Sequence, residues 1–117
     1  MKIENAKAQM RKGVLEYCIL SLAEQRDMYS SDIISSLKEA ELIVVEGTLY
    51  PLLTRLKNAG LLTYRWEESK SGPPRKYYAI TDNGKSFLTE LDDSWKNLVN
   101  SVNKTTNINL NKDDKDN

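Results

Sequence analysis

A chain of 117 residues, 39% of them hydrophobic, can bury one modest core. Its 17 Lys and Arg residues balance 17 Asp and Glu residues, so total charge gives no sign of a nucleic-acid partner. Cys18 is the single cysteine and histidine is absent, which excludes a disulfide within the chain and most catalytic or metal-ligand groupings. We therefore expect no enzyme, no metal and no cofactor. Without a membrane-length apolar run or a signal-peptide pattern, the expected location is the cytoplasm.

Positive charge is concentrated in two segments. Residues 1–15 carry a net charge of +3 and residues 47–80 carry +4, whereas the intervening residues 16–46 carry −5. Clustered Lys and Arg side chains are the electrostatic footprint of nucleic-acid binding. Any contact with phosphates is therefore expected at these two segments.

Apolar side chains recur at helical spacing from about residue 5 to residue 24 and predict one long first helix. They are Met10, Val14, Leu15, Cys18, Ile19 and Leu22. Ser30 or Ser31 can cap a second helix that ends near Ala40. Its expected inward residues are Ile33, Ile34 and Leu37. The β-branched residues 42–45 fit either an edge strand or an extended connection.

A third helix is predicted up to residue 59, and Gly60 stands where a left-handed C-terminal residue is usually needed. Its apolar residues are Leu49, Leu52, Leu53, Leu56 and Ala59. Because Pro51 lacks an amide hydrogen, either the helix begins just upstream or its first hydrogen bonds are irregular. At 100° per residue the core leucines share one side, and the other side is free for contacts.

Two strands follow, because residues 62–67 and, more loosely, residues 76–80 alternate apolar with polar side chains. The segment Gly72-Pro73-Pro74 between them predicts a hairpin with a long loop. A fourth helix is predicted over residues 81–104. Its apolar stripe is Phe87, Leu88, Leu91, Trp95, Leu98, Val99 and Val102. Residues 105–117 are mostly Asn, Lys, Asp and Thr, which predicts a disordered tail.

Three helices, two strands and a further helix are the element order of a winged helix-turn-helix, in which the third helix reads DNA and the hairpin is the wing. The expected fold is mainly α with a small antiparallel β-hairpin. The expected parts are a winged-helix DNA-binding domain over residues 1–80, a C-terminal dimerisation helix over 81–104 and the tail. Dimerisation is expected because a long helix with one apolar face and no further domain must bury that face elsewhere.

Two segments carry a resemblance to a known family. Residues 47–62 read Gly-Thr-Leu-Tyr-Pro-Leu-Leu-Thr-Arg-Leu-Lys-Asn-Ala-Gly-Leu-Leu, and residues 72–84 read Gly-Pro-Pro-Arg-Lys-Tyr-Tyr-Ala-Ile-Thr-Asp-Asn-Gly. Together they resemble the signature of PadR-like transcriptional regulators, over roughly residues 8–102. The resemblance implies a homodimeric bacterial repressor of double-stranded DNA whose first and last helices pack against those of a partner. Many family members have Ser-Pro where this chain has Val45-Glu46.

Candidate DNA contacts lie on three elements. Those on the third helix are Thr48, Tyr50, Thr54 and Arg55. Those on the wing are Lys70, Ser71, Arg75 and Lys76. Lys7 and Arg11, four residues apart on the first helix, are candidates for contact with the flanking backbone. For each group a structural role is open as well, because Tyr50 can pack at a helix edge and exposed cations are often only solvated.

The C-terminal helix is the candidate interface. Its expected interface residues are Leu91, Trp95, Leu98 and Val99. A tryptophan at helical spacing usually packs in a core or a dimer contact. In some short PadR-like proteins such a tryptophan lines a cavity for flat aromatic compounds, and Trp95 resembles it by position. The resemblance thus implies a small aromatic ligand as a further partner.

A winged helix that binds only protein is the alternative function. In that case the basic hairpin serves an acidic partner surface rather than phosphates. Salt dependence of duplex binding separates the two functions, because only phosphate contacts release counterions from DNA.

Overall fold

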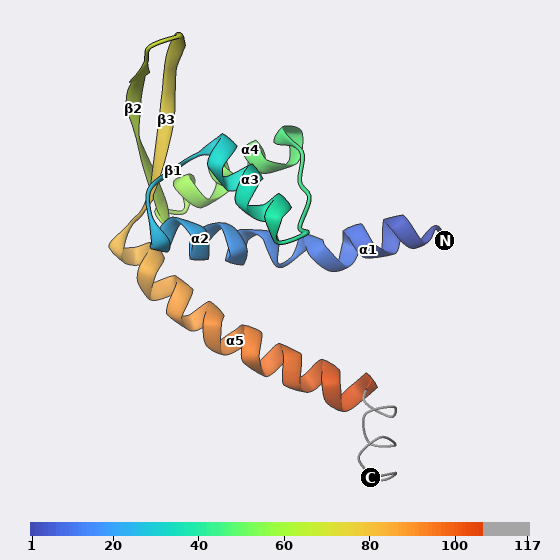
Figure 1. Ribbon diagram of the computed structural model, residues 1–117. Coiled ribbons are helices and arrows are strands. Elements are labelled where there is room, and N and C mark those ends of the chain that lie inside the picture. Colours follow the sequence, from blue (N-terminus) through green and yellow to red (C-terminus); the bar gives the residue numbers. More distant parts are fainter. Residues whose placement is uncertain (107–117) are drawn as a thin grey trace.

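The computed structural model describes residues 1–106, which form five helices and a three-stranded sheet in this part of the chain (Figure 1). The elements are α1 Ile3–Lys12, α2 Leu15–Gln25, β1 Met28–Tyr29, α3 Ser30–Glu39, α4 Glu46–Asn58, β2 Leu62–Ser69, β3 Gly72–Ile80 and α5 Asp82–Thr106. The mainly helical fold with a small antiparallel sheet is confirmed. The predicted tail starts too early, because residues 105 and 106 end α5, and its remainder, 107–117, lies outside the described residues.

The prediction of one long N-terminal helix is wrong, because α1 and α2 are separated at Gly13 and Val14. Glycine is a poor helix former, and α1 has no buried residue whose packing could offset that weakness. Met10, expected on the inward face, is 80% exposed. The inward face is confirmed only from Leu15 onward, where α2 enters the core.

The second predicted helix is confirmed as α3, but its start differs from the expected serine cap. Tyr29 precedes the helix, and its backbone N–H donates to Asp32 Oδ2 at 3.0 Å. The serines 30 and 31 lie inside the first turn, so their hydroxyls are free to contact other elements. Residues 42–45 form a connection without strand structure, which settles the alternative left open by their β-branched sequence.

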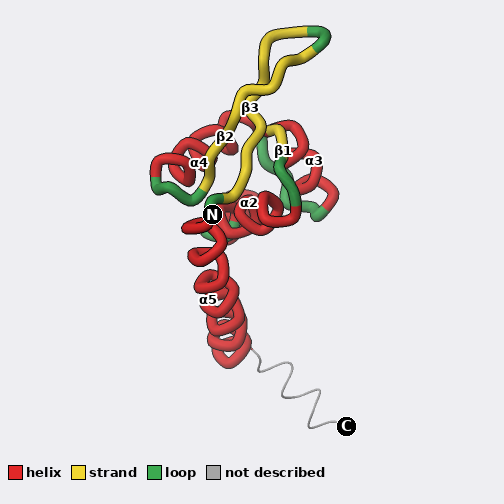
Figure 2. The backbone as a smooth tube through the Cα atoms, turned by 90° about the vertical axis from the view of Figure 1, so that its left-hand side faces the viewer, coloured by secondary structure: helices red, strands yellow, loops and turns green. Residues whose placement is uncertain are grey.

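The sheet has the order β1-β3-β2, and all its pairs are antiparallel. The sequence did not predict β1, a two-residue strand whose Met28 and Tyr29 pair with β3. The prediction of a long hairpin loop is also wrong, because β2 and β3 continue to Ser69 and Gly72 and leave a two-residue turn. The pairing register shifts near Glu68, where this one residue of β2 lies opposite Pro73 and Pro74 of β3. The two prolines thus form a bulge, and their missing N–H groups are tolerated there. Figure 2 shows the resulting hairpin projecting from the helices.

Helix α4 begins at Glu46, five residues before Pro51, so the alternative in which it starts upstream holds. Pro51 is exposed, and solvent can bond to the Gly47 carbonyl that would otherwise accept from residue 51. The left-handed residue after the helix is confirmed, since Gly60 has φ of 78°. The backbone N–H of Leu61 then donates to the Leu56 carbonyl at 3.0 Å, which closes the helix end.

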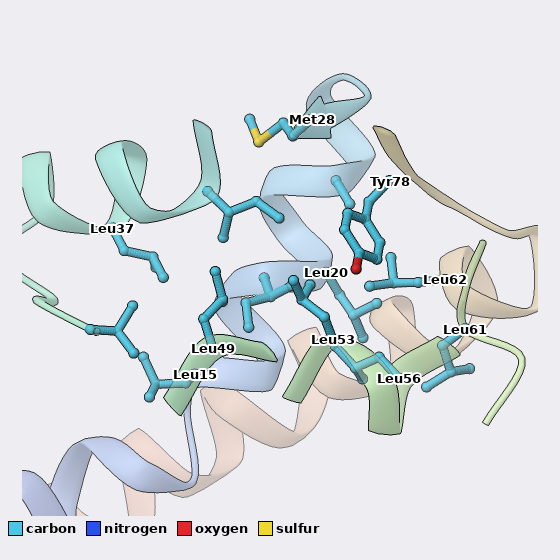
Figure 3. Close-up of a cluster of buried hydrophobic side chains, with 14 of the residues drawn as sticks. Leu15, Leu20, Met28, Leu37, Leu49, Leu53, Leu56, Leu61, Leu62 and Tyr78 are labelled. Carbon is cyan, nitrogen blue, oxygen red and sulfur yellow. The ribbon is translucent and has the colours of Figure 1, made fainter. Parts of the chain in front are cut away.

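The core lies among α2, α3, α4 and the base of the sheet (Figure 3). Leu49, Leu53 and Leu56 of α4 are buried there, as their spacing predicted. Figure 3 shows Leu20 of α2 and Tyr78 of β3 among these leucines. One side of α4 is therefore fixed against the core, and its other side faces outward.

Helix α5 is joined tightly to the end of α4. Thr81 Oγ1 donates to the Gly60 carbonyl oxygen at 2.6 Å and accepts from the Gly84 N–H at 2.9 Å. Gly84 approaches the Leu61 carbonyl so closely that a Cβ at this position would overlap it. Beyond this joint α5 leaves the body on the side away from the hairpin (Figures 1 and 2). Of its predicted apolar stripe, only Leu88 is buried within the described chain.

Candidate nucleic-acid interface

A groove of about 590 Å³ lies between the start of α3, the outer side of α4 and the hairpin. Side chains from all three elements line it: Ser30 and Ser31, Glu46 and Tyr50, and Arg75 and Lys76. The groove forms because β1 holds the start of α3 beside β3, while the core leucines turn the opposite side of α4 outward. It brings together one predicted residue of the reading helix and two of the wing.

Tyr50 and Thr54 lie on the side of α4 that faces the hairpin. Tyr50 is 44% exposed, and its hydroxyl lies 3.1 Å from Ser30 Oγ. Thr54 is exposed one turn further along, and lines a smaller pocket together with Lys57 and Lys76. Both hydroxyls can donate to or accept from a nucleic acid placed along this side of α4.

Thr48 and Arg55 lie on the other flank of α4. Arg55 Nε is 3.3 Å from Glu16 Oε2 of α2, so the guanidinium is directed toward α2 rather than toward the hairpin. Thr48 is exposed and lines a hollow with Arg11 of α1. The structure therefore separates the four predicted residues of α4 into two pairs, Tyr50 with Thr54 and Thr48 with Arg55.

Arg75 and Lys76 are held by aromatic rings in the middle of the hairpin. The Arg75 guanidinium lies 3.9 Å from the centroid of the Tyr29 ring, and its Nη2 donates to Ser31 Oγ at 2.7 Å. The Lys76 ammonium lies 4.6 Å from the centroid of the Tyr64 ring and 5.6 Å from that of Trp66. Cations stacked in this way keep their charge while losing little side-chain freedom on binding an anion.

The remaining predicted contacts, on the hairpin turn and on α1, lie away from the groove. Lys70 and Ser71 form the exposed hairpin turn. Lys7 forms an exposed ion pair with Glu4 at 3.8 Å, whereas Arg11 is partly buried. Because none of these residues lines the groove, a duplex bound there would contact them only if it extended beyond the groove.

Arg65 is a structural residue of the wing that the sequence did not indicate. Its Nη1 donates to Asp27 Oδ2 at 2.9 Å, its Nε donates to Glu67 Oε1 at 2.8 Å, and its guanidinium stacks over Tyr77 at 4.5 Å. The hydrogen bond to Asp27, followed by that to Glu67, raises the pKa of Arg65 above its ordinary value. Asp27 lies 38 positions earlier, so only the pairing of β1 with β3 reveals this contact.

The candidate interface residues lie along the side of α5 that faces α2 and are only partly covered by it. Trp95 is 41% exposed and Leu98 is 53% exposed, whereas Leu91 and Val99 are half-buried. The Trp95 ring centroid is 6.2 Å from that of Tyr17, whose hydroxyl donates to Asp92 Oδ1 at 2.5 Å. This hydrogen bond, with a smaller effect of burial, raises the pKa of Tyr17 to about 12.

A hollow of about 430 Å³ lies beside Tyr17, between α2, the end of α4 and α5, and Phe87 and Leu91 contribute to its lining. Burial raises the pKa of Cys18, so its thiol stays protonated at neutral pH. Within residues 1–106 no group of three or more His, Cys, Asp or Glu side chains is placed to hold a metal ion. Among the helices of residues 1–106, none combines the length and the hydropathy of a membrane span.

The order of helices, the outward side of α4 and the cationic hairpin beside it define a winged-helix transcriptional regulator with an added C-terminal helix. Residues 19–90 match the sequence profile of the family described as "Transcriptional regulator PadR-like family". The chain belongs to the PadR-like family of transcriptional regulators. Its members are regulators and not enzymes.

Solved structures and a curated relative agree with this assignment. A PadR-like transcription factor from Bacteroides fragilis is 64% identical, with a TM-score of 0.74 over 87% of this chain and 99% of that chain. A PadR family transcriptional regulator from Eggerthella lenta is 33% identical, with a TM-score of 0.82 over 88% of this chain and 90% of that chain. An uncharacterised protein of Lysinibacillus sphaericus is 32% identical over 92 residues, which are 76% of this chain and 84% of that protein.

Proposed function

We propose that this protein is a homodimeric repressor that binds a near-palindromic operator in double-stranded DNA. Helix α4 enters the major groove, and the hairpin contacts the backbone or the minor groove. Because its target is the chromosome, it acts in the cytoplasm. The observation that carries this proposal is the groove in which the outer side of α4 and the cations Arg75 and Lys76 face one volume.

The groove has the donors that a phosphate requires. Arg75 and Lys76 supply positive charge, and Ser30 and Ser31 supply hydroxyls at the N-terminus of α3. Backbone N–H groups at a helix N-terminus also favour an anion. A DNA strand held there by its phosphates leaves Tyr50 and Thr54 beside the base edges.

Two such units form one operator-binding surface through their terminal helices. Ile3 and Met10 of α1 are 65% and 80% exposed, and Leu98 and Val102 of α5 are 53% and 48% exposed. Apolar surface of this kind favours a partner chain, and a twofold arrangement makes the contact self-complementary. In the dimer the two α4 helices lie roughly 34 Å apart, one turn of DNA.

A small aromatic effector releases the repressor in this proposal. Its support is the partly exposed Trp95 beside Tyr17, on the side of α5 assigned to the dimer. The ligand enters between the C-terminal helices and changes the tilt of the two winged units. It acts only if it binds the released geometry more tightly than the DNA-bound geometry.

Salt titration of duplex binding by the full-length protein tests the DNA-binding function. With about 6 phosphate contacts per dimer, the slope of log affinity against log salt is expected near −5. In vitro selection of bound duplexes is expected to yield inverted half-sites one helical turn apart. If no duplex binds even at about 50 mM salt, the hairpin serves a protein partner instead and the proposed function is wrong.

Trp95→Ala tests the effector separately. In the unchanged protein, aromatic compounds that bind are expected to quench tryptophan fluorescence and to weaken operator binding. The variant is expected to lose affinity for these compounds or to dimerise more weakly. The effector proposal is abandoned if the variant keeps both the dimer and the ligand affinity of the unchanged protein.

A further inference from the structure

Glu46 is a carboxylate within an otherwise cationic groove. It is the first residue of α4, it is exposed, and it lines the same groove as Tyr50, Arg75 and Lys76. Within residues 1–106 it forms no ion pair and no side-chain hydrogen bond. An anionic group on the DNA side of a reading helix therefore requires an explanation.

A phosphate cannot be the partner of this side chain. A carboxylate only accepts hydrogen bonds, and it repels the charged DNA backbone. The cations Arg75 and Lys76 lie in the same groove and attract the phosphates. Glu46 instead occupies the N-terminal end of α4, and the N-terminal residues of a recognition helix are those that reach base edges.

Base chemistry then limits what Glu46 can bind. In the major groove cytosine presents its N4 amino donor, whereas guanine and thymine present acceptors that repel a carboxylate. Adenine presents one donor next to the N7 acceptor, so it suits a carboxylate less well than cytosine does. We infer that Glu46 is a specificity-determining residue that selects cytosine at one position of each half-site. This inference rests on the proposed DNA-binding function.

The competing explanation is structural. A carboxylate in the first turn of a helix is favoured by the helix dipole without any ligand. Such a residue changes the stability of the helix and the electrostatic potential of the groove. Its removal would strengthen or weaken binding to every duplex alike. Base preference distinguishes this explanation from a reading role.

The experiment is in vitro duplex selection with the full-length protein and with Glu46→Gln, Glu46→Ala and Glu39→Gln. Glu39 ends α3, is exposed and does not line the groove, so its variant makes the same charge change elsewhere. Glu46→Ala is expected to lose the cytosine preference at one position per half-site and to bind the selected duplex ~5- to 100-fold more weakly. Glu46→Gln is expected to shift that position toward adenine, because glutamine pairs with the adenine edge. Glu39→Gln is expected to select the same sites as the unchanged protein.

Circular dichroism confirms that each variant is folded before selection. If both Glu46 variants select the same bases as the unchanged protein, the inference is overturned, whatever their overall affinity. Loss of preference at every position alike overturns it too, because that result indicates a damaged interface. If the unchanged protein itself selects no duplex, the proposed function fails first and the inference fails with it.

Discussion

Three cationic side chains of the hairpin, Arg65, Arg75 and Lys76, lie over tyrosine rings. They have different roles. Arg65 has two carboxylate partners and links the hairpin to the segment before β1. Among residues 1–106, Arg75 has only a hydroxyl as hydrogen-bond partner, that of Ser31, and Lys76 is held by aromatic rings. Arg75 and Lys76 can therefore bind a phosphate with little rearrangement of their side chains.

The double variant Arg75→Ala and Lys76→Ala is expected to weaken binding to all duplexes alike. The salt slope should become flatter by about one or two units, because two phosphate contacts are removed. Fluorescence anisotropy at several salt concentrations measures both quantities. Lys38→Ala with Lys85→Ala removes the same charge from exposed positions outside the groove and should leave the slope unchanged. An unchanged salt slope in the hairpin variant would show that Arg75 and Lys76 do not contact phosphates.

Tyr17 gives a pH-dependent prediction. Its folded pKa of about 12 lies above the ordinary tyrosine value of 10.0, because its hydroxyl donates to Asp92. A raised folded pKa means that the stabilisation is complete below pH 10 and is lost as pH rises toward 12. Unfolding free energy should therefore fall more steeply over this interval in the unchanged protein than in Tyr17→Phe. Spectrophotometric titration of Asp92→Asn should move the Tyr17 midpoint down toward 10, and an unmoved midpoint contradicts the assignment.

The candidate DNA site was predictable in part. Helical periodicity placed Thr54 on the free side of α4 and Tyr50 at its edge, and both face the hairpin in the structure. The local cluster of positive charge indicated Arg75 and Lys76. The separation of Arg55 from these residues was not predictable, because it depends on Glu16 of a different helix. Local sequence gives the direction of a side chain around its own helix, while the neighbour on that side is set by tertiary packing.

At the scale of the elements, α3 and α4 end in the same way with different residues. Gly60 follows α4 with φ of 78°, and Glu41 follows α3 with φ of 65°. In both cases the next N–H bonds back into the helix, from Leu61 to Leu56 and from Leu42 to Leu37. A side chain disfavours this left-handed conformation, and glycine does not.

Gly60→Ala is therefore expected to lower the unfolding free energy by about 1 to 2 kcal/mol. Glu41→Gly is expected to raise it by up to about 1 kcal/mol, since the added freedom of the unfolded glycine offsets part of the gain. Chemical denaturation measures both changes. Gly13→Ala is a suitable comparison, because φ there is −77° and nothing lies within 4 Å of an added Cβ. Equal effects of alanine at positions 13 and 60 would exclude the conformational explanation.

The helices were largely predictable, and the sheet less so. The spacing of Leu49, Leu53 and Leu56 and the glycine after them were sufficient to locate α4. Nothing local predicted β1, because two residues carry no periodicity and the strand exists only through its pairing with β3. The two hairpin prolines indicated a loop, but a bulge places them within β3.

At the scale of the whole molecule, α1 and the distal part of α5 are arms, whereas the first half of α5 packs against α2. α1 has no buried residue, and the described part of α5 buries only Gly84 and Leu88. The principal extents of the chain, 61 × 33 × 25 Å, reflect this shape (Figure 1). Helices of this kind are usually stabilised by a partner rather than by their own sequence.

Leu98→Glu is expected to convert the proposed dimer to a monomer, because the substitution would bury a charge in its apolar contact. Sedimentation velocity measures the change in mass, and operator affinity should fall with it because each monomer reaches only one half-site. Asn100→Glu places the same charge on the opposite side of α5 and should remain dimeric. A monomeric unchanged protein would remove the basis of the twofold operator.

The joint between Thr81, Gly84 and the residues after α4 has a mechanical consequence. With 25 residues, α5 is a rod of about 37 Å. Its first end is hydrogen-bonded to Gly60, just after the reading helix, and its middle is bonded to α2 through Asp92 and Tyr17. A 10° rotation about the first end moves the far end by about 6 Å. A compound that displaces the distal portion of α5 would therefore act on α2 and on the residues that follow α4.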